Sequence, residues 1–302
     1  CGIDACAPVQ EFWADLSDTD NPLRRGEALR HAFLEGIPSL EAAGFGPFIT
    51  ASAFGFGAGQ VRTNSFNQGP WTLREVKTRT VFLKQEDKGG IQPPQSFVEF
   101  VPVPVAANPF GRLWDHTAAL PESKACAKAL VDSVASLMPD DPNLMGVSVP
   151  VECLAAESPD SSVMEYRQQL DSEGLLAKMI ANRIVQLDPD STLTPEHIAN
   201  RALFAGGCIG CHQRSNSGLN DDLGNGVHTP NSAGFVHTLE FQSTQEDCGD
   251  GTTDCFRVSD ALATSFLPHR KQVMDAFLNG GPCCEMDSPL ESTAEFAPLG
   301  AE

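Results

Sequence analysis

The sequence predicts an α+β fold with a small antiparallel sheet in its first half and mainly helices in its second half. Three segments between Gln60 and about Val105 are rich in Val, Thr, Phe and Trp with partial alternation, which is typical of strands. Apolar residues recur at helical spacing before this stretch, around Phe33, and again from Ala127 onward. We therefore expect an N-terminal domain with a small antiparallel sheet and helices, followed by a mainly helical domain.

The expected elements of the first half are a helical region and three strands. In "PLRRGEALRHAFLEGIPSLEAAG", Leu29, Phe33 and Ile37 stand at helical spacing before a glycine stop. The strand candidates are "QVRTNSF", "WTLREVKTRTVFLK" and "SFVEFVPVPVA". Pro102 and Pro104 suit an edge strand or its exit, because proline donates no backbone hydrogen bond.

Helices dominate the expected second half. "ESKACAKALVDSVASLM" and "GLLAKMIANRIVQL" are amphipathic, and "PEHIANRALFAGG" continues from the polar connection "LDPDSTLTPEH". Thr194 can cap this last helix, and Pro195 suits its first position. The connection is also the expected boundary between a domain at 1–190, of unassigned role, and a second domain at 191–302.

Composition and charge are typical of a soluble globular protein with an acidic surface. The hydrophobic fraction is 41%, and no apolar run approaches the roughly 20 residues of a membrane helix. Forty acidic against twenty basic residues give a net charge of −20, which argues against nucleic acid and anionic membranes as partners. A basic docking surface would be attracted to this chain, although solubility alone also explains such charge.

Ten cysteines favour an oxidising location: the periplasm, the cell surface or the medium. Eight of them lie outside the motif described below, an even number that is compatible with four disulfides. The connectivity stays open, but candidate closures are Cys126 with Cys153 and Cys248 with Cys255, while the adjacent Cys283 and Cys284 are expected to bond to different partners.

The chain starts at Cys1 followed by Gly2, and we expect this start to result from removal of a signal sequence. Two interpretations of Cys1 remain open. It is either the lipid-anchored first residue of a lipoprotein or one half of a disulfide with Cys6.

The segment "GGCIGCHQ" contains Cys208-x-x-Cys211-His212, which is the spacing that attaches c-type haem. In such a site the two thiols form thioethers with the porphyrin vinyl groups, and the adjacent histidine can coordinate the iron. Composition alone predicts about 0.008 chance occurrences of this pattern in the chain. One covalently attached haem c is therefore the expected cofactor.

Two other interpretations of the cysteine pair stay open. A zinc site needs a second ligand pair at short spacing, which the remaining cysteines do not supply well. A disulfide or a redox-active pair of the thioredoxin kind is expected at a strand-to-helix turn, whereas a predicted helix precedes this motif.

The flanking sequence "NRALFAGGCIGCHQ" resembles the entry to a class I c-type cytochrome domain, in which a helix with an aromatic and small residues runs into CxxCH. The resemblance covers residues 190–302 and implies that a terminal helix packs back on the first one. "PHRKQVMDAFLNGG" is the candidate terminal helix, through Val273, Phe277 and Leu278. The family commonly supplies a distal methionine before that helix, and this sequence has none there.

Histidines are therefore the expected source of the sixth iron ligand. In "FVHTLEF" a strand would place His237 on one face with Phe235, Leu239 and Phe241, and an apolar face suits a haem pocket. His237 is the preferred distal ligand opposite His212. The alternatives are His269, His228, Met274, Met286 and an open sixth position.

These residues predict an extracytoplasmic monohaem c-type cytochrome that transfers electrons to or from a redox partner protein. Cys208 and Cys211 would anchor the haem, and His212 and His237 would bind its iron, which implies a lower potential than histidine–methionine ligation. Two other functions remain open: a haem enzyme such as a peroxidase or oxygenase with an open iron site, and a surface-binding lipoprotein whose CxxC is only a disulfide. The oligomeric state is not predicted.

Overall fold

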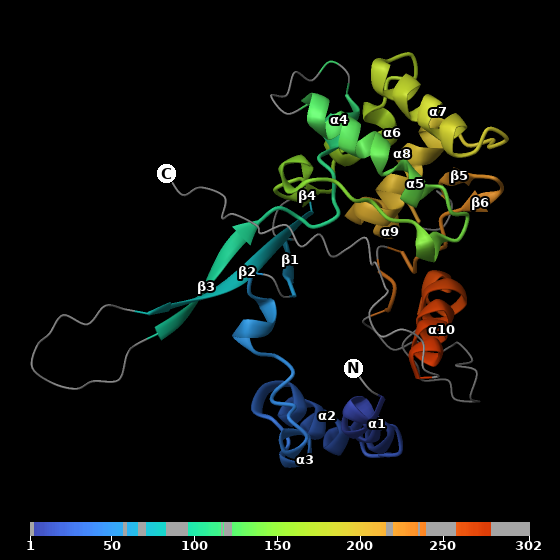
Figure 1. The fold of residues 1–302 in the computed structure, drawn as a ribbon. Helices are drawn as coiled ribbons and strands as arrows, with labels where there is room; N and C mark the ends of the chain where they lie inside the picture. Colours follow the sequence, from blue (N-terminus) through green and yellow to red (C-terminus); the bar gives the residue numbers. More distant parts are fainter. Residues whose placement is uncertain are drawn as a thin grey trace, which may run out of the picture.

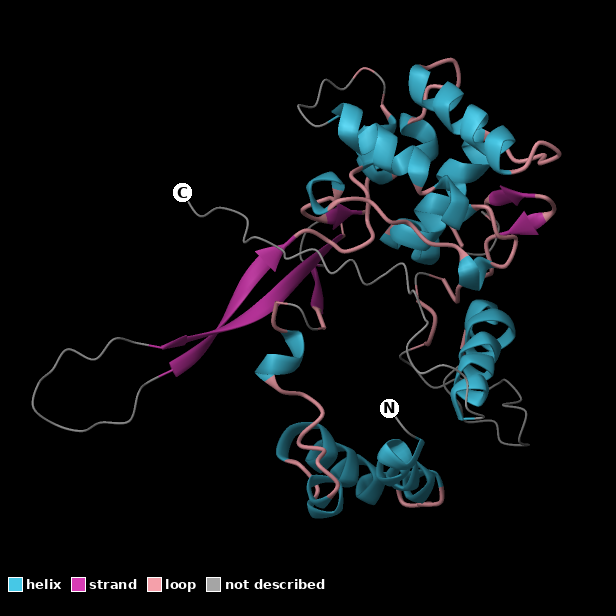
Figure 2. Cartoon of the chain, viewed as in Figure 1, coloured by secondary structure: helices cyan, strands magenta, loops and turns pink. Residues whose placement is uncertain are grey.

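The computed structural model describes residues 3–56, 59–65, 71–82, 96–115, 117, 123–215, 220–234, 236–239 and 258–278. Helices and an antiparallel sheet are both present, which confirms the predicted α+β class (Figure 1). Figure 2 shows an N-terminal helical group, a projecting ribbon of strands, and a helical body that contains the CxxCH motif.

The N-terminal group consists of α1 (Ile3–Ser17), α2 (Pro22–Arg30) and α3 (Pro38–Ala42). Asn21 caps α2, since its side chain accepts hydrogen bonds from two backbone N–H groups of the first turn. Edge-to-face aromatic contacts hold the group together, with ring centroids 5.4–6.5 Å apart, among Phe12, Trp13, Phe33 and Phe48.

The sheet contains the three predicted strands in the order β1 (Val61–Ser65), β2 (Thr72–Phe82) and β3 (Ser96–Val103), all antiparallel. A short fourth strand, β4 (Ser158–Pro159), pairs with the start of β2 and joins the sheet to the helical body. β3 is an edge strand that contains Pro102, as its composition predicts.

The body is built from helices around one buried apolar cluster. Its helices are α4 (Ser123–Asp132), α5 (Val134–Leu137), α6 (Tyr166–Gln169), α7 (Leu175–Leu187), α8 (Pro195–Gly206) and α9 (Cys208–His212). The cluster includes Trp114, Leu130, Tyr166, Ile180, Ile198, Leu203 and Ile209. It thus draws side chains from both sides of residue 190, and the domain boundary there stays a prediction.

A disulfide between Cys126 and Cys153, with Cα atoms 5.5 Å apart, lies in the same cluster and is the pair expected from the sequence. The other expected cysteine pairings lie outside the described residues, which do not include Cys1, Cys248, Cys255, Cys283, Cys284 or the side chain of Cys6. The same holds for Met286, Phe235 and Phe241.

α8 begins as predicted. The Thr194 hydroxyl accepts a hydrogen bond from the backbone N–H of His197 (3.2 Å), and His197 Nδ1 accepts one from the backbone N–H of Thr194 (3.2 Å). The hairpin of β5 (Asp222–Gly224) and β6 (Val227–His228) packs beside this helix. Asn225 and Gly226 turn it, both at positive φ (56° and 77°), which is the conformation that an Asn-Gly hairpin turn favours.

The last described helix, α10 (Leu267–Leu278), does not pack back along α8 as the cytochrome resemblance implied. Between Arg270 and Ala276 its side chains are exposed except for Val273, and Figure 1 shows it beside the body rather than along α8. The contact with α8 is made by Phe266, the residue just before α10, whose ring stacks on Phe204 with centroids 6.3 Å apart. The side chains of Phe277 and Leu278 do not belong to the described part of the structure.

None of the helices within the described residues is long and apolar enough to cross a bilayer.

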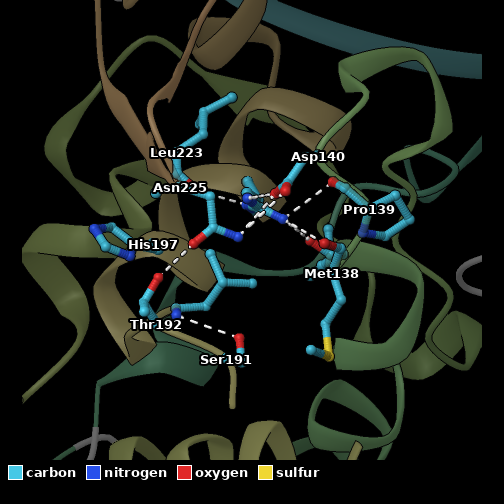
Figure 3. A network of polar contacts seen from close by, with 12 residues as sticks. Met138, Pro139, Asp140, Ser191, Thr192, His197, Leu223 and Asn225 are labelled. Atoms are coloured by element: carbon cyan, nitrogen blue, oxygen red, sulfur yellow. Dashed lines mark hydrogen bonds and ion pairs between the residues drawn. The ribbon is translucent and has the colours of Figure 1, made fainter. Parts of the chain in front are cut away.

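A fully buried arginine, Arg201 on α8, ties the body together (Figure 3). Its Nη2 donates to Asp140 Oδ1 at 2.7 Å, and Asn225 Nδ2 donates to the same carboxylate oxygen at 3.1 Å. Its other nitrogens donate to four backbone carbonyls, those of Leu137 (3.0 Å), Met138 (2.8 Å), Pro139 (3.0 Å) and Leu223 (2.6 Å). One side chain therefore joins α8, the end of α5 and strand β5.

We expect Arg201→Met to lower the free energy of unfolding by roughly 3–5 kcal/mol, because two buried carbonyls, two partly buried ones and a carboxylate would lose their donor. Urea unfolding followed by circular dichroism measures this loss. Lys128→Met is the matched control, since it breaks an exposed ion pair with Asp132 (2.5 Å) and should cost less than about 1 kcal/mol. Equal losses in the two variants would contradict this assignment.

Candidate functional site

The CxxCH residues form α9, which folds back against the end of α8. Glycines make this approach possible. A Cβ at Gly206 would overlap the backbone carbonyl of Ala107, and one at Gly210 would overlap the backbone carbonyl of Leu203. The glycines of "GGCIGC" thus have a packing role that the spacing of the cysteines and the histidine does not require.

The two cysteines of the motif are free thiols, and both are mostly shielded from solvent. Burial raises the pKa of Cys208, and the Ser158 hydroxyl and the charge of Arg62 partly oppose this rise. Burial, with Cys208 as a second cause, raises the pKa of Cys211 to about 11. Both thiols are therefore protonated at neutral pH, which argues against a redox-active dithiol, because such a pair needs a lowered pKa.

The structure brings His237 next to His212, although the two are far apart in the sequence. Their ring centroids are 5.2 Å apart and the ring planes meet at 58°. The indole of Trp71, which directly precedes β2, lies 6.4 Å from the His212 ring. The proximal and distal ligands expected from the sequence thus share one site, with the base of the sheet as a neighbour.

Hydrogen bonds fix the His237 ring from both sides. Nδ1 lies 2.9 Å from the Ser259 hydroxyl, and Nε2 lies 3.1 Å from the backbone carbonyl of Cys211 and 3.2 Å from its sulfur. Because a carbonyl only accepts, Nε2 carries the proton in this network and Nδ1 accepts from Ser259. The Ser259 oxygen in turn accepts from the backbone N–H of Leu262 at 3.1 Å.

Burial lowers the pKa of His237, the charge of His212 lowers it further, and the hydrogen bond to the Cys211 carbonyl opposes them. His237 is consequently neutral at pH 7. A neutral imidazole is the form that binds metal ions, so no proton has to be removed before ligation at this pH.

An aromatic side chain links His237 to a small apolar cluster. Phe266 meets the His237 ring edge to face at 6.2 Å and stacks on Phe204 of α8. Met145 and Leu223 belong to the same small buried cluster as Phe204. His237 therefore has an apolar neighbour on the side of Phe266.

Arg214, two positions beyond His212, is held by two acidic side chains. The Arg214 guanidinium makes two parallel hydrogen bonds to Asp221 (2.9 and 2.6 Å), and its Nε lies 3.8 Å from Glu165 Oε2. Burial raises the pKa of Glu165, and the charge of Arg214 partly opposes this rise. The group ties the end of the motif to α6 and to the segment before β5.

The site residues fit a covalently attached haem in donor type. Two thiols and a histidine stand at the required spacing, and the neutral imidazole of His237 lies beside the motif with the Ser259 hydroxyl at its Nδ1. The two histidine rings are in contact, with centroids 5.2 Å apart, so haem binding would require them to separate and His237 to give up its bond to Cys211.

Among the described candidates for the distal position, His237 is the one that hydrogen-bonds to the motif or contacts its ring. His228 is exposed on β6, opposite Asp222 in the hairpin. His269 and Met274 lie on α10, where Met274 is exposed. The strand expected at "FVHTLEF" is not found in its described part, where Val236 and Thr238 make only isolated bridges.

The zinc interpretation gains nothing from the structure. Within the described residues, no three side chains among His, Cys, Asp and Glu are placed to hold one metal ion.

Sequence reasoning missed the residues that complete the site: Ser259, Phe266, Trp71 and Ser158. No spacing rule connects them to the motif, because each reaches it through tertiary packing from a separate element. Arg214 was missed as well, although a cation two positions after a predicted iron ligand can be weighed from the sequence.

Comparisons of the chain with models of protein families, with curated proteins and with solved structures give no match.

We expect Cys211 to react slowly with iodoacetamide in protein produced without haem attachment. At pH 8 a thiol of pKa about 11 has roughly 100-fold less thiolate than one of pKa 9, and its rate should rise about tenfold per pH unit up to about pH 11. Mass spectrometry of quenched, digested samples measures the rate at each pH, with free cysteine as the reference. Reaction at the rate of free cysteine at pH 8 would contradict the burial described here.

Proposed function

We propose that this chain is an extracytoplasmic monohaem c-type cytochrome that transfers electrons. Cys208 and Cys211 would attach the haem, and His212 and His237 would be its axial ligands. The observation that carries the proposal is the position of His237, whose ring stands 5.2 Å from that of His212 while its Nε2 faces the CxxCH helix. This contact supports His237 as the distal ligand.

When bound, haem c would supply a one-electron redox centre whose potential histidine–histidine ligation lowers. The protein residues bind and orient. Ser259 can hold His237 in either tautomer, because its hydroxyl donates to an unprotonated Nδ1 and accepts from a protonated one. This matters because ligation through Nε2 moves the imidazole proton to Nδ1.

Water exclusion is the second contribution of the protein. Phe266 covers one side of His237 and is backed by the buried cluster that contains Phe204 and Leu223. A low-dielectric surrounding disfavours a gain of charge at the centre and reduces the reorganisation that accompanies electron transfer.

The disulfide between Cys126 and Cys153 supports an oxidising location, since such bonds are rare in reducing compartments. A net charge of −20 supports a redox partner with a basic docking surface, because opposite charges speed the encounter of electron-transfer proteins.

Intact mass decides whether haem is attached. We expect the protein made with a haem-attachment system to gain about 616 Da per chain and to give a reduced pyridine spectrum of haem c. A variant with Cys208→Ser and Cys211→Ser should lose both signals and serves as the control. A native chain that carries no added mass under these conditions would contradict the proposal.

The distal ligand is tested by comparing His237→Ala with His228→Ala. We expect the first to open the iron, so that the oxidised spectrum becomes high-spin and the reduced protein binds carbon monoxide, while the second stays low-spin and unreactive. His237→Met should add absorption near ~695 nm in the oxidised state, the mark of methionine ligation. A low-spin His237→Ala variant would show that another residue closes the iron.

A further inference from the structure

The distal half of the β2–β3 ribbon exposes a band of large apolar side chains. Phe82, Val98 and Phe100 are 67%, 43% and 61% exposed. Thr80 pairs with Val98 and Thr78 with Phe100, and opposed residues of an antiparallel ladder share a face, so the three apolar side chains lie on one side of the ribbon. Their exposed surface is roughly 300 Å², a size at which apolar patches of soluble proteins mark contacts.

The same ribbon has an open backbone edge. Among the described residues β3 pairs only with β2. Pro102 stands opposite Val76 and has no N–H, so this pair is not hydrogen-bonded, and by alternation the N–H and C=O groups of Phe100 and Val98 point away from β2. The other side of β2 shows the same alternation, because Val76 and Thr78 direct their backbone groups away from β3: Val76 pairs with β1, and Thr78 bridges to Gly55.

Between Ser96 and Val101 the edge carries one charged residue, Glu99, while Pro102 blocks strand addition beyond Val101. Arg79 and Glu99, which face each other across the ribbon, form an ion pair at 2.6 Å, so no unpaired charge from them faces a neighbour. The ribbon projects away from the helical body (Figure 2), so a contact made at its outer end leaves the body at a distance.

We propose that a second copy of this chain adds to β3 edge to edge, antiparallel, with Val98 opposite Val98 of the second copy. In this register Phe100 faces Ser96, and Ser96, Val98 and Phe100 all direct their N–H and C=O outward, so these pairs exchange two hydrogen bonds each. Phe97 and Glu99 face each other between them as pairs that are not hydrogen-bonded across the interface. Centring on Phe100 would bring Pro102 into the ladder, and centring on Glu99 would oppose like charges. The strand pairs form one continuous sheet across the two copies.

Mass in solution tests the pairing on the full chain. We expect the mean mass from sedimentation and light scattering to rise with concentration from 32.3 kDa towards twice that value. Because the contact is small, the concentrations should extend to about 500 μM. Val98→Pro should abolish this rise, since it removes an outward N–H that β2 does not use. Val98→Ile keeps the N–H and should dimerise like the native chain. A native chain that stays monomeric throughout this range overturns the proposal.

A cysteine substitution tests the register, and it does so even if the proline variant fails to fold. Val98→Cys should form a disulfide between copies under mild oxidation, because facing Cα atoms of a hydrogen-bonded pair lie about 5.5 Å apart. Glu99→Cys is the matched control: residue 99 faces Phe97 in this register, so the two introduced cysteines are offset by two positions along the strands and lie beyond disulfide reach. Equal cross-linking of both, or a ribbon that binds lipid vesicles while the chain stays monomeric, overturns the proposal.

Discussion

The buried guanidinium of Arg201 is the interaction on which the position of the motif depends. It stands on α8, whose last residue is followed after one glycine by the CxxCH helix, so any shift of α8 moves both thiols and His212. Four carbonyls and one carboxylate fix this helix against the end of α5 and against β5. Burying a cation is costly unless every donor is used, and here each guanidinium nitrogen has an acceptor.

The second end of the site is held by a different kind of contact. His237 lies in a segment with little regular structure, and its place is set by Ser259 just before the final helix and by the ring of Phe266. One proposed ligand, His212, therefore sits on a short helix anchored through α8, and the other, His237, on a loop held by one hydroxyl and an aromatic contact. The side of His237 is the easier one to move, and the proposed haem binding requires His237 to move.

Most of the elements could be predicted from the sequence because their signals are local. The strands at β1, β2 and β3 follow from β-branched and aromatic residues, the cap of α8 from Thr194 and Pro195, and the edge position of β3 from Pro102. The CxxCH motif is equally local, since the haem interpretation rests on its spacing alone. His237 was selected from its apolar neighbours, and the structure places it at the motif although its expected strand is absent.

What the sequence could not provide depends on packing between distant segments. The terminal helix α10 carries an apolar pattern that suits α8, yet the contact with α8 is made by Phe266 before α10 begins. The partners of Arg201 are mainly backbone carbonyls, which carry no residue-type signal. Ser259 and Trp71 likewise reach the site through tertiary contacts that no spacing along the chain encodes.

Tyr166 is the single tyrosine of the chain, and it is fully buried behind the motif, stacked on Trp114 with ring centroids 5.2 Å apart. Its hydroxyl donates to the backbone carbonyl of Pro109 at 2.6 Å, and burial, with Cys208 nearby, raises its pKa well above the ordinary value. Ionisation of this phenol therefore requires the core to open. Because no other tyrosine contributes, near-ultraviolet absorbance in alkali gives this protein an intrinsic optical probe of the core directly beneath the cysteine pair.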